Sequence, residues 1–240
     1  MDQASLGKTK TNELTVQGAP FSWAPWLTAV SGTLLVFVTL TWLILTSQDI
    51  RDFDLSIGRT LQQHAHDHSA VRQFFWLVTW VGGIVGLTVL ATTGTLTMLF
   101  SRRYLLAAIW VLATAGGALV NLAIKETVAR VRPIPEMRDE SVAHIGNPSF
   151  PSGHAMGSAI GMGMCLFVAL RFLNGKRAKL LISIGLVMLI LLIGFSRIYL
   201  RAHWFTDVLG GFTLGASWLV LCLAIATRFR AGAPSEGGRK

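Results

Sequence analysis

The hydrophobic residues of this chain are grouped into six long stretches that contain no Asp, Glu, Lys or Arg. Most of these stretches approach or exceed the ~20 residues that an α-helix needs to cross a bilayer. The fourth starts with a loop, so its helix is expected to begin near Pro151, and the fifth reaches full length only if it extends to Lys179 and Arg197. Six transmembrane helices are therefore predicted. The stretches are residues 26–46, 74–100, 104–124, 141–170, 180–196 and 208–227.

The composition indicates an all-α, polytopic membrane protein. Of 240 residues, 52% are hydrophobic and 14% are charged, which is more apolar side chain than one soluble core of this length can bury. We expect a cytoplasmic polar tail (1–22), a six-helix membrane domain (23–230) and a disordered tail (231–240). No cleaved signal peptide is recognisable, so the first span should remain. Cys165 and Cys222 fall inside apolar stretches and do not indicate a disulfide framework.

The net charge of +9 favours anionic lipid head groups over nucleic acid as partners, because the basic residues are scattered over loops and tails. The two tails and the even-numbered loops hold 12 Lys and Arg residues, against nine in the odd-numbered loops. Three of those nine, Lys125, Arg132 and Arg197, have a chemical explanation given below. The remaining imbalance predicts that both termini are cytoplasmic and that the first, third and fifth loops face the opposite side.

Small residues recur at every fourth position in two of the predicted spans. Gly153, Gly157 and Gly161 open the fourth span, and Gly211 and Gly215 lie in the sixth. This spacing lets helix backbones approach closely, so the two spans are expected to pack tightly, although glycine is also simply common in membrane helices.

Three polar clusters occur at the predicted extracytoplasmic ends of spans three to six, where charge beside a bilayer requires a reason. In the first, Lys125 and Arg132 are separated by two helical turns, with Pro133 marking the end of the helix. Two cations on one helix face can hold separate oxygens of a phosphate. Basic residues beside a span are also ordinary, so this cluster alone is weak evidence.

The second cluster, Pro151-Ser152-Gly153-His154, lies where the fourth helix is expected to begin. Ser152 is a good N-cap, and Gly153 allows a ligand to approach the free amides of the helix N-terminus, which favour anions. His154 adds a group that titrates near neutral pH. The alternative is a capped helix start with an interfacial histidine.

The third cluster joins spans five and six and contains His203 and Asp207 at positions i and i+4. On a helix these side chains meet on one face. A carboxylate that accepts the proton of one ring nitrogen leaves the lone pair of the other nitrogen free to attack phosphorus.

Together the clusters resemble the signature of the type 2 phosphatidic acid phosphatases, also called lipid phosphate phosphatases. That signature is Lys-x6-Arg-Pro, then Pro-Ser-Gly-His, then Ser-Arg-x5-His-x3-Asp, and it occurs here in order between Lys125 and Asp207. The resemblance implies six membrane helices with the active site at the extracytoplasmic ends of helices 3 to 6. It implies attack by His203, acid/base catalysis by His154 and orientation by Asp207. It implies phosphate binding by Lys125, Arg132, Ser152, Gly153 and Arg197.

The same residues favour a mechanism through a phosphohistidine without metal or other cofactor, because cations beside the phosphate can neutralise its charge. The remaining acids form only two close pairs, Asp52 with Asp54 and Asp139 with Glu140, and we interpret both as solvated loop residues. The first-loop histidines are interpreted as part of a wet interfacial loop. No role is assigned to His64, His66, His68, His144 and Arg201.

The sequence thus predicts an integral membrane phosphatase that acts on a lipid phosphomonoester or diphosphate. Undecaprenyl diphosphate, phosphatidylglycerophosphate and phosphatidate are the candidate substrates. A lipid phosphotransferase would share the first half-reaction, so it stays an alternative. A transporter or lipid-binding scaffold is a further alternative, but its charges would be expected in the middle of spans.

Overall fold

The computed structural model describes residues 22–133 and 148–231, which form helices and connecting turns. Residues 1–21 and 232–240, which hold nearly all of the two predicted tails, lie outside it. The helices are α1 (Ala24–Thr46), α2 (Gln48–Asp67), α3 (Ser69–Val81), α4 (Ile84–Phe100), α5 (Tyr104–Val111), the π-helical turn η1 (Leu112–Gly116), α6 (Gly117–Val128), α7 (Gly153–Phe172), α8 (Lys176–Tyr199) and α9 (Phe205–Ala231).

The predicted all-α fold with six membrane spans is confirmed. In the described residues, six helical segments are long and apolar enough to cross a membrane. Five of them extend beyond the predicted apolar stretches into the polar flanks, and the fourth begins at Gly153, close to the start expected near Pro151. The spans are Ala24–Thr46, Ser69–Phe100, Tyr104–Val128, Gly153–Phe172, Lys176–Tyr199 and Phe205–Phe229.

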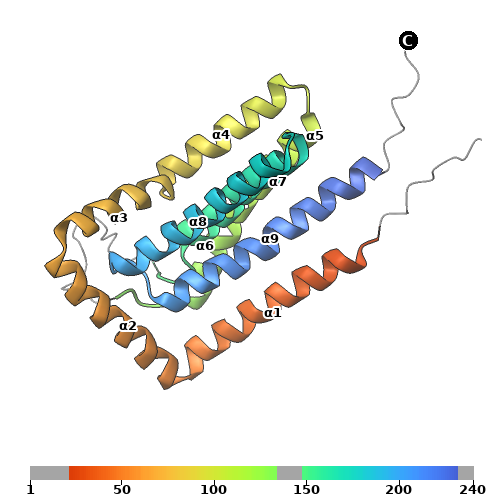
Figure 1. Cartoon of the computed structure of the whole chain (residues 1–240). Helices are drawn as coiled ribbons and strands as arrows, with labels where there is room; N and C mark the ends of the chain where they lie inside the picture. Colours follow the sequence, from red (N-terminus) through yellow and green to blue (C-terminus); the bar gives the residue numbers. More distant parts are fainter. Residues whose placement is uncertain (1–21, 134–147, 232–240) are drawn as a thin grey trace, which may run out of the picture.

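Helix α9 packs most extensively against α1 and α7, and α1 and α9 run side by side along the bundle (Figure 1). Glycine makes the α7–α9 contact close. A Cβ on Gly211 would lie 2.6 Å from the carbonyl oxygen of Ser152, and one on Gly215 would lie 3.0 Å from that of Met156. The predicted tight packing of the fourth and sixth spans is therefore confirmed.

The glycines of the fourth span serve a different contact. A Cβ on Gly157 would lie 2.4 Å from a methyl carbon of Leu87, and one on Gly161 would lie 3.0 Å from Leu90. Both leucines belong to α4. The glycines of α7 thus allow close packing against α4, and the glycines of α9 allow close packing against α7.

The segment after the first span is a helix and not the wet loop that the sequence suggested. Helix α2 begins after Ser47, whose side chain accepts a hydrogen bond from the backbone N–H of Ile50. It runs across one end of the bundle and joins the end of α1 to the start of α3 (Figure 1). It is strongly amphipathic, and it packs on α8 and α9. We refer to this end as the α2 end.

Candidate active site

Lys125 and Arg132 meet at one carbonyl group, although they do not share a helix face as predicted. Helix α6 ends at Val128, and Ala129 adopts a left-handed conformation with φ of 47°, which turns the chain before Arg132. Pro148 O then accepts hydrogen bonds from Lys125 Nζ (2.5 Å) and Arg132 Nη2 (3.5 Å). The turn, not helical periodicity, brings the two cations together.

The second cluster forms the N-terminus of α7, as expected. Ser152 is the N-cap, and its Oγ accepts a hydrogen bond from Ala155 N at 3.5 Å. Its backbone N–H donates to Asp207 O (3.0 Å), which ties this helix start to α9. His154 is half-buried and lies beside the break between α3 and α4, since a Cβ on Gly83 would be 3.5 Å from His154 Nε2.

His203 and Asp207 approach each other as predicted, but through a turn and not along a helix. Helix α9 begins only at Phe205, and His203 Nδ1 lies 3.4 Å from Asp207 Oδ2. Nδ1 has no hydrogen-bond partner of good geometry, so the pair is close but not tightly bonded. His203 Nε2 lies on the other side of the ring, 3.4 Å from Arg132 Nη1. The Asp207 carboxylate and the Arg132 guanidinium group therefore face opposite ring nitrogens.

Burial keeps His203 neutral. The residue is 4% exposed, and burial lowers the pKa of its imidazole well below the usual 6.5, with Arg132 and Arg197 lowering it further. A neutral imidazole whose Nδ1 faces a carboxylate has a lone pair available on Nε2. That nitrogen faces the Arg132 guanidinium group, so a phosphate held by Arg132 would lie within its reach.

Two cations at this site, Lys125 and Arg197, have no matching carboxylate among the described residues. Lys125 and Arg197 are 6% and 5% exposed, and neither forms an ion pair with an acidic residue in the described part of the chain. Arg197 Nη1 donates to Thr79 Oγ1 at 2.6 Å, while its Nε has no partner. Buried charge of one sign is costly unless an anion complements it. The arrangement thus suits an anionic ligand such as a phosphate.

A second buried ionic group was not recognised from the sequence. Arg130 Nη1 donates to Asp207 Oδ1 at 2.6 Å, and its Nη2 donates to Asp54 Oδ2 at 2.7 Å. The interpretation of Asp54 as a solvated loop residue is wrong, because it is 2% exposed. The sequence does indicate this burial. At helical spacing Asp54 lies on the same stripe of α2 as Ile50, Ile57 and Leu61, which is the apolar face.

The described residues to which no role was assigned from the sequence make other contacts. His64 Nδ1 is 3.1 Å from the Tyr199 hydroxyl, and its ring stacks on His68. Arg201 is buried against α2, where a Cβ on Gly58 would collide with its guanidinium group. His144 and the Asp139–Glu140 pair fall outside the described residues, as does the side chain of His66.

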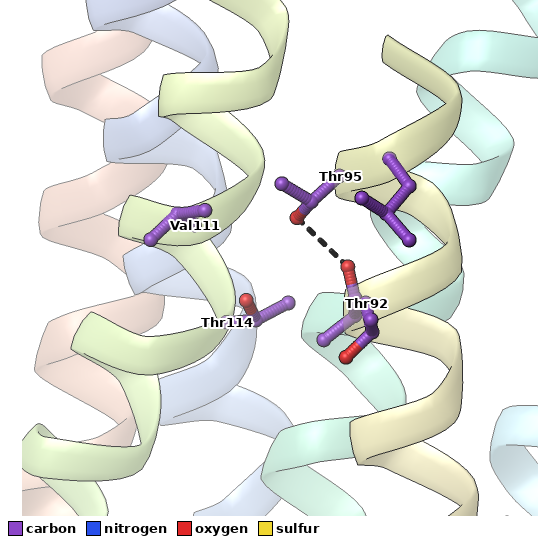
Figure 2. Close-up of a pocket in the computed structure, with 6 residues that line it drawn as sticks. Thr92, Thr95, Val111 and Thr114 are labelled. Carbon is purple, nitrogen blue, oxygen red and sulfur yellow. Dashed lines mark hydrogen bonds between the residues drawn. The ribbon is translucent and has the colours of Figure 1, made fainter. Parts of the chain in front are cut away.

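Two grooves between the described membrane helices are lined by none of these side chains. A groove of about 260 Å³ between α4 and the α5–η1 segment is lined by Thr92, Thr95 and Thr114 (Figure 2). Thr95 and Thr114 donate to the carbonyl groups of their own helices at 2.8 and 2.9 Å. The hydroxyl donors of Thr95 and Thr114 are therefore already used within their own helices.

The fold is that of a multi-pass membrane protein, and its cations cluster at the α2 end. Residues 104–231 match the family model of the PAP2 superfamily, and the chain belongs to that family. The resemblance to type 2 phosphatidic acid phosphatases is therefore confirmed. The matched region contains all three polar clusters.

Two relatives from Bacillus subtilis are similar to this chain. Phosphatidylglycerophosphatase B of strain 168 is 35% identical over 121 residues, which cover 49% of this chain and 57% of that protein. The chain thus matches little more than half the length of this curated relative. The crystal structure of the first transmembrane PAP2 type phosphatidylglycerolphosphate phosphatase from B. subtilis has a TM-score of 0.74 and 25% identity. The matched region covers 83% of this chain and 96% of the B. subtilis chain in that crystal structure.

The hydroxyl of Thr79 should contribute to anion binding through Arg197. Thr79→Val keeps the shape of the side chain but leaves a buried charged donor without its acceptor, which costs about 1–3 kcal/mol. We expect the affinity for inorganic phosphate to fall about tenfold. This affinity is measured from the rise in melting temperature of the purified protein as phosphate is added.

Thr79→Ser retains the hydroxyl and serves as the matched control. An undiminished phosphate effect in Thr79→Val would show that Arg197 does not need this hydrogen bond.

Proposed function

We propose that this protein is an integral membrane phosphatase that hydrolyses a lipid phosphate through a phosphohistidine intermediate. The observation that carries the proposal is the neutral, buried His203, whose Nε2 faces Arg132 while its Nδ1 faces Asp207. Membership of the PAP2 superfamily and the names of the two B. subtilis relatives support a phosphatase.

The first half-reaction transfers the phosphoryl group to the enzyme. Lys125, Arg132 and Arg197 bind the phosphate oxygens together with the amides near Gly153, and they neutralise the charge that spreads over these oxygens. The lone pair of His203 Nε2 forms a bond to phosphorus as the bond to the lipid oxygen breaks. His154 gives that oxygen its proton, so the lipid leaves as a neutral alcohol.

The second half-reaction returns the enzyme to its starting state. His154, now unprotonated, takes a proton from water, and the water oxygen attacks phosphorus as the phosphorus–nitrogen bond breaks. Inorganic phosphate leaves, and the lone pair of His203 is restored. No metal is required, because the three cations occupy the position that a divalent ion has in other phosphoryl-transfer sites.

Phosphatidylglycerophosphate is the favoured substrate, because both relatives are named for its hydrolysis. Undecaprenyl diphosphate and phosphatidate present the same kind of terminal phosphate and remain candidates. A phosphotransferase would replace water with a lipid hydroxyl in the second half-reaction. A transporter is disfavoured, because the polar clusters lie at the ends of spans and not in their middle.

We also propose the orientation that the charge distribution favours. Both termini are cytoplasmic, the α2 end faces the extracytoplasmic side, and residues 23–230 act as one membrane domain. The substrate phosphate then lies in the outer leaflet, at the head-group level of the bilayer.

Phosphate release from a panel of lipid phosphates tests the activity. Purified protein in detergent should release phosphate from phosphatidylglycerophosphate, and excess EDTA should leave the rate unchanged. His203→Ala should be inactive on every substrate. Loss of activity in EDTA with recovery in Mg²⁺ would contradict the metal-free site.

Labelling with a radioactive aryl phosphate tests the intermediate. An activated aryl group leaves without protonation, so His154→Ala should still be phosphorylated, whereas its hydrolysis should be slow for want of a base. Acid-labile, base-stable label should accumulate on His154→Ala and be absent from His203→Ala. Persistent label on His203→Ala would place the nucleophile elsewhere.

Cysteine labelling in intact cells tests the orientation. In a background with Cys165 and Cys222 replaced by alanine, Gln63→Cys at the α2 end should react with an impermeant maleimide. Arg177→Cys, which is exposed at the opposite end, should react only after the membrane is broken. The reverse pattern would invert the topology.

A further inference from the structure

A buried chain of ionic groups connects α2 to the catalytic pair. Arg130 lies between two carboxylates, and the side chains of Asp54 and Asp207 are 1% and 0% exposed, while that of Arg130 is 11% exposed. The three groups come from α2, from the turn after α6 and from the first turn of α9. Removing one partner from such a group leaves an uncompensated buried charge, so each member constrains the others.

Arg130 fixes the orientation of the Asp207 carboxylate. Oδ1 accepts from Arg130 Nη1 at 2.6 Å, and Oδ2 accepts from the backbone N–H of Trp204 at 2.9 Å. With both oxygens held from opposite sides, the carboxylate plane cannot rotate freely. Oδ2 therefore stays directed toward His203 Nδ1, 3.4 Å away.

Asp54 in turn fixes Arg130 and the start of α9. Its Oδ2 accepts from Arg130 Nη2 at 2.7 Å and from Thr206 Oγ1 at 2.5 Å. Its Oδ1 accepts from the backbone N–H of Thr206 at 3.1 Å, one of the free amides at this helix start. A residue of α2 thus caps the helix that carries Asp207.

The charge balance of this group suits the reaction. Two carboxylates and one guanidinium leave one net negative charge beside His203. When Nε2 bonds to phosphorus while Nδ1 keeps its proton, the imidazole ring becomes positive. A group with net negative charge beside the ring stabilises that positive charge. A single carboxylate paired with a guanidinium would be neutral overall and would stabilise it less.

We propose that Arg130 and Asp54 are positioning residues of the phosphatase, acting on turnover through Asp207. The proposal rests on the proposed function. Neither residue belongs to the set proposed to bind the phosphate. Both set the direction and the net charge of the carboxylate that supports His203, so their loss should affect the chemical step and leave substrate binding intact.

A double-mutant cycle tests this assignment. The turnover number and KM for phosphatidylglycerophosphate in detergent micelles are measured for wild type, Asp54→Asn, Arg130→Gln and Asp207→Asn, and for the two double variants with Asp207→Asn. Each positioning variant alone should lower kcat about 10–100-fold, as expected for groups that orient a functional side chain, with KM near the wild-type value. In the Asp207→Asn background neither should lower kcat further.

Asp52→Asn is the matched control, since Asp52 lies on the exposed face of α2 two residues from Asp54. It should turn over like wild type. Asp54→Asn keeps the shape and one acceptor oxygen, so it decides the question even if Arg130→Gln does not fold.

Wild-type kcat in Asp54→Asn, or equal fractional losses in the two backgrounds, would overturn the positioning role, because an independent structural defect adds to that of Asp207→Asn. Wild-type turnover by Asp207→Asn itself would instead overturn the proposed mechanism, and the positioning roles with it.

Discussion

The two ion pairs of Arg130 are the contact on which the arrangement of the α2 end depends. They join α2, the turn after α6 and the start of α9, three segments that are far apart in the sequence. A guanidinium group suits this role because its planar fork presents donors in two directions, whereas an ammonium group has no such fixed geometry. The cost of burying the carboxylates is offset only while all partners stay in place, so the group favours one register of the three segments.

The cations near the site differ in whether their hydrogen-bond acceptors are charged or neutral. Arg130 is compensated by Asp54 and Asp207, whereas Lys125 and Arg197 donate to neutral oxygens of Pro148 and Thr79. Neutral acceptors orient a cation without cancelling its charge. The uncompensated cations therefore remain available to an anionic ligand, while the compensated one stabilises the protein around it.

Much of the fold could be predicted from the sequence, because a bilayer requires long apolar helices and these are visible as uncharged stretches. The N-cap at Ser152 was also predictable from local sequence, and so was the approach of His203 to Asp207, although a turn and not a helix produces it. What could not be predicted depends on tertiary contacts. The left-handed turn at Ala129 contradicts simple helical spacing, and the ion pair of Asp54 joins it to Arg130, which lies 76 residues away in the chain.

The break in the second span shows how one apolar stretch can serve two purposes. Helix α3 packs on α8 and places Thr79 against Arg197, whereas α4 packs on α5 and α7. A straight helix could not meet both sets of partners. Gly86 permits the break, since a Cβ there would lie 2.3 Å from the carbonyl oxygen of Val81 at the end of α3. Helix α3 can therefore be oriented by its contacts near the site, while α4 is oriented by its packing on α5 and α7.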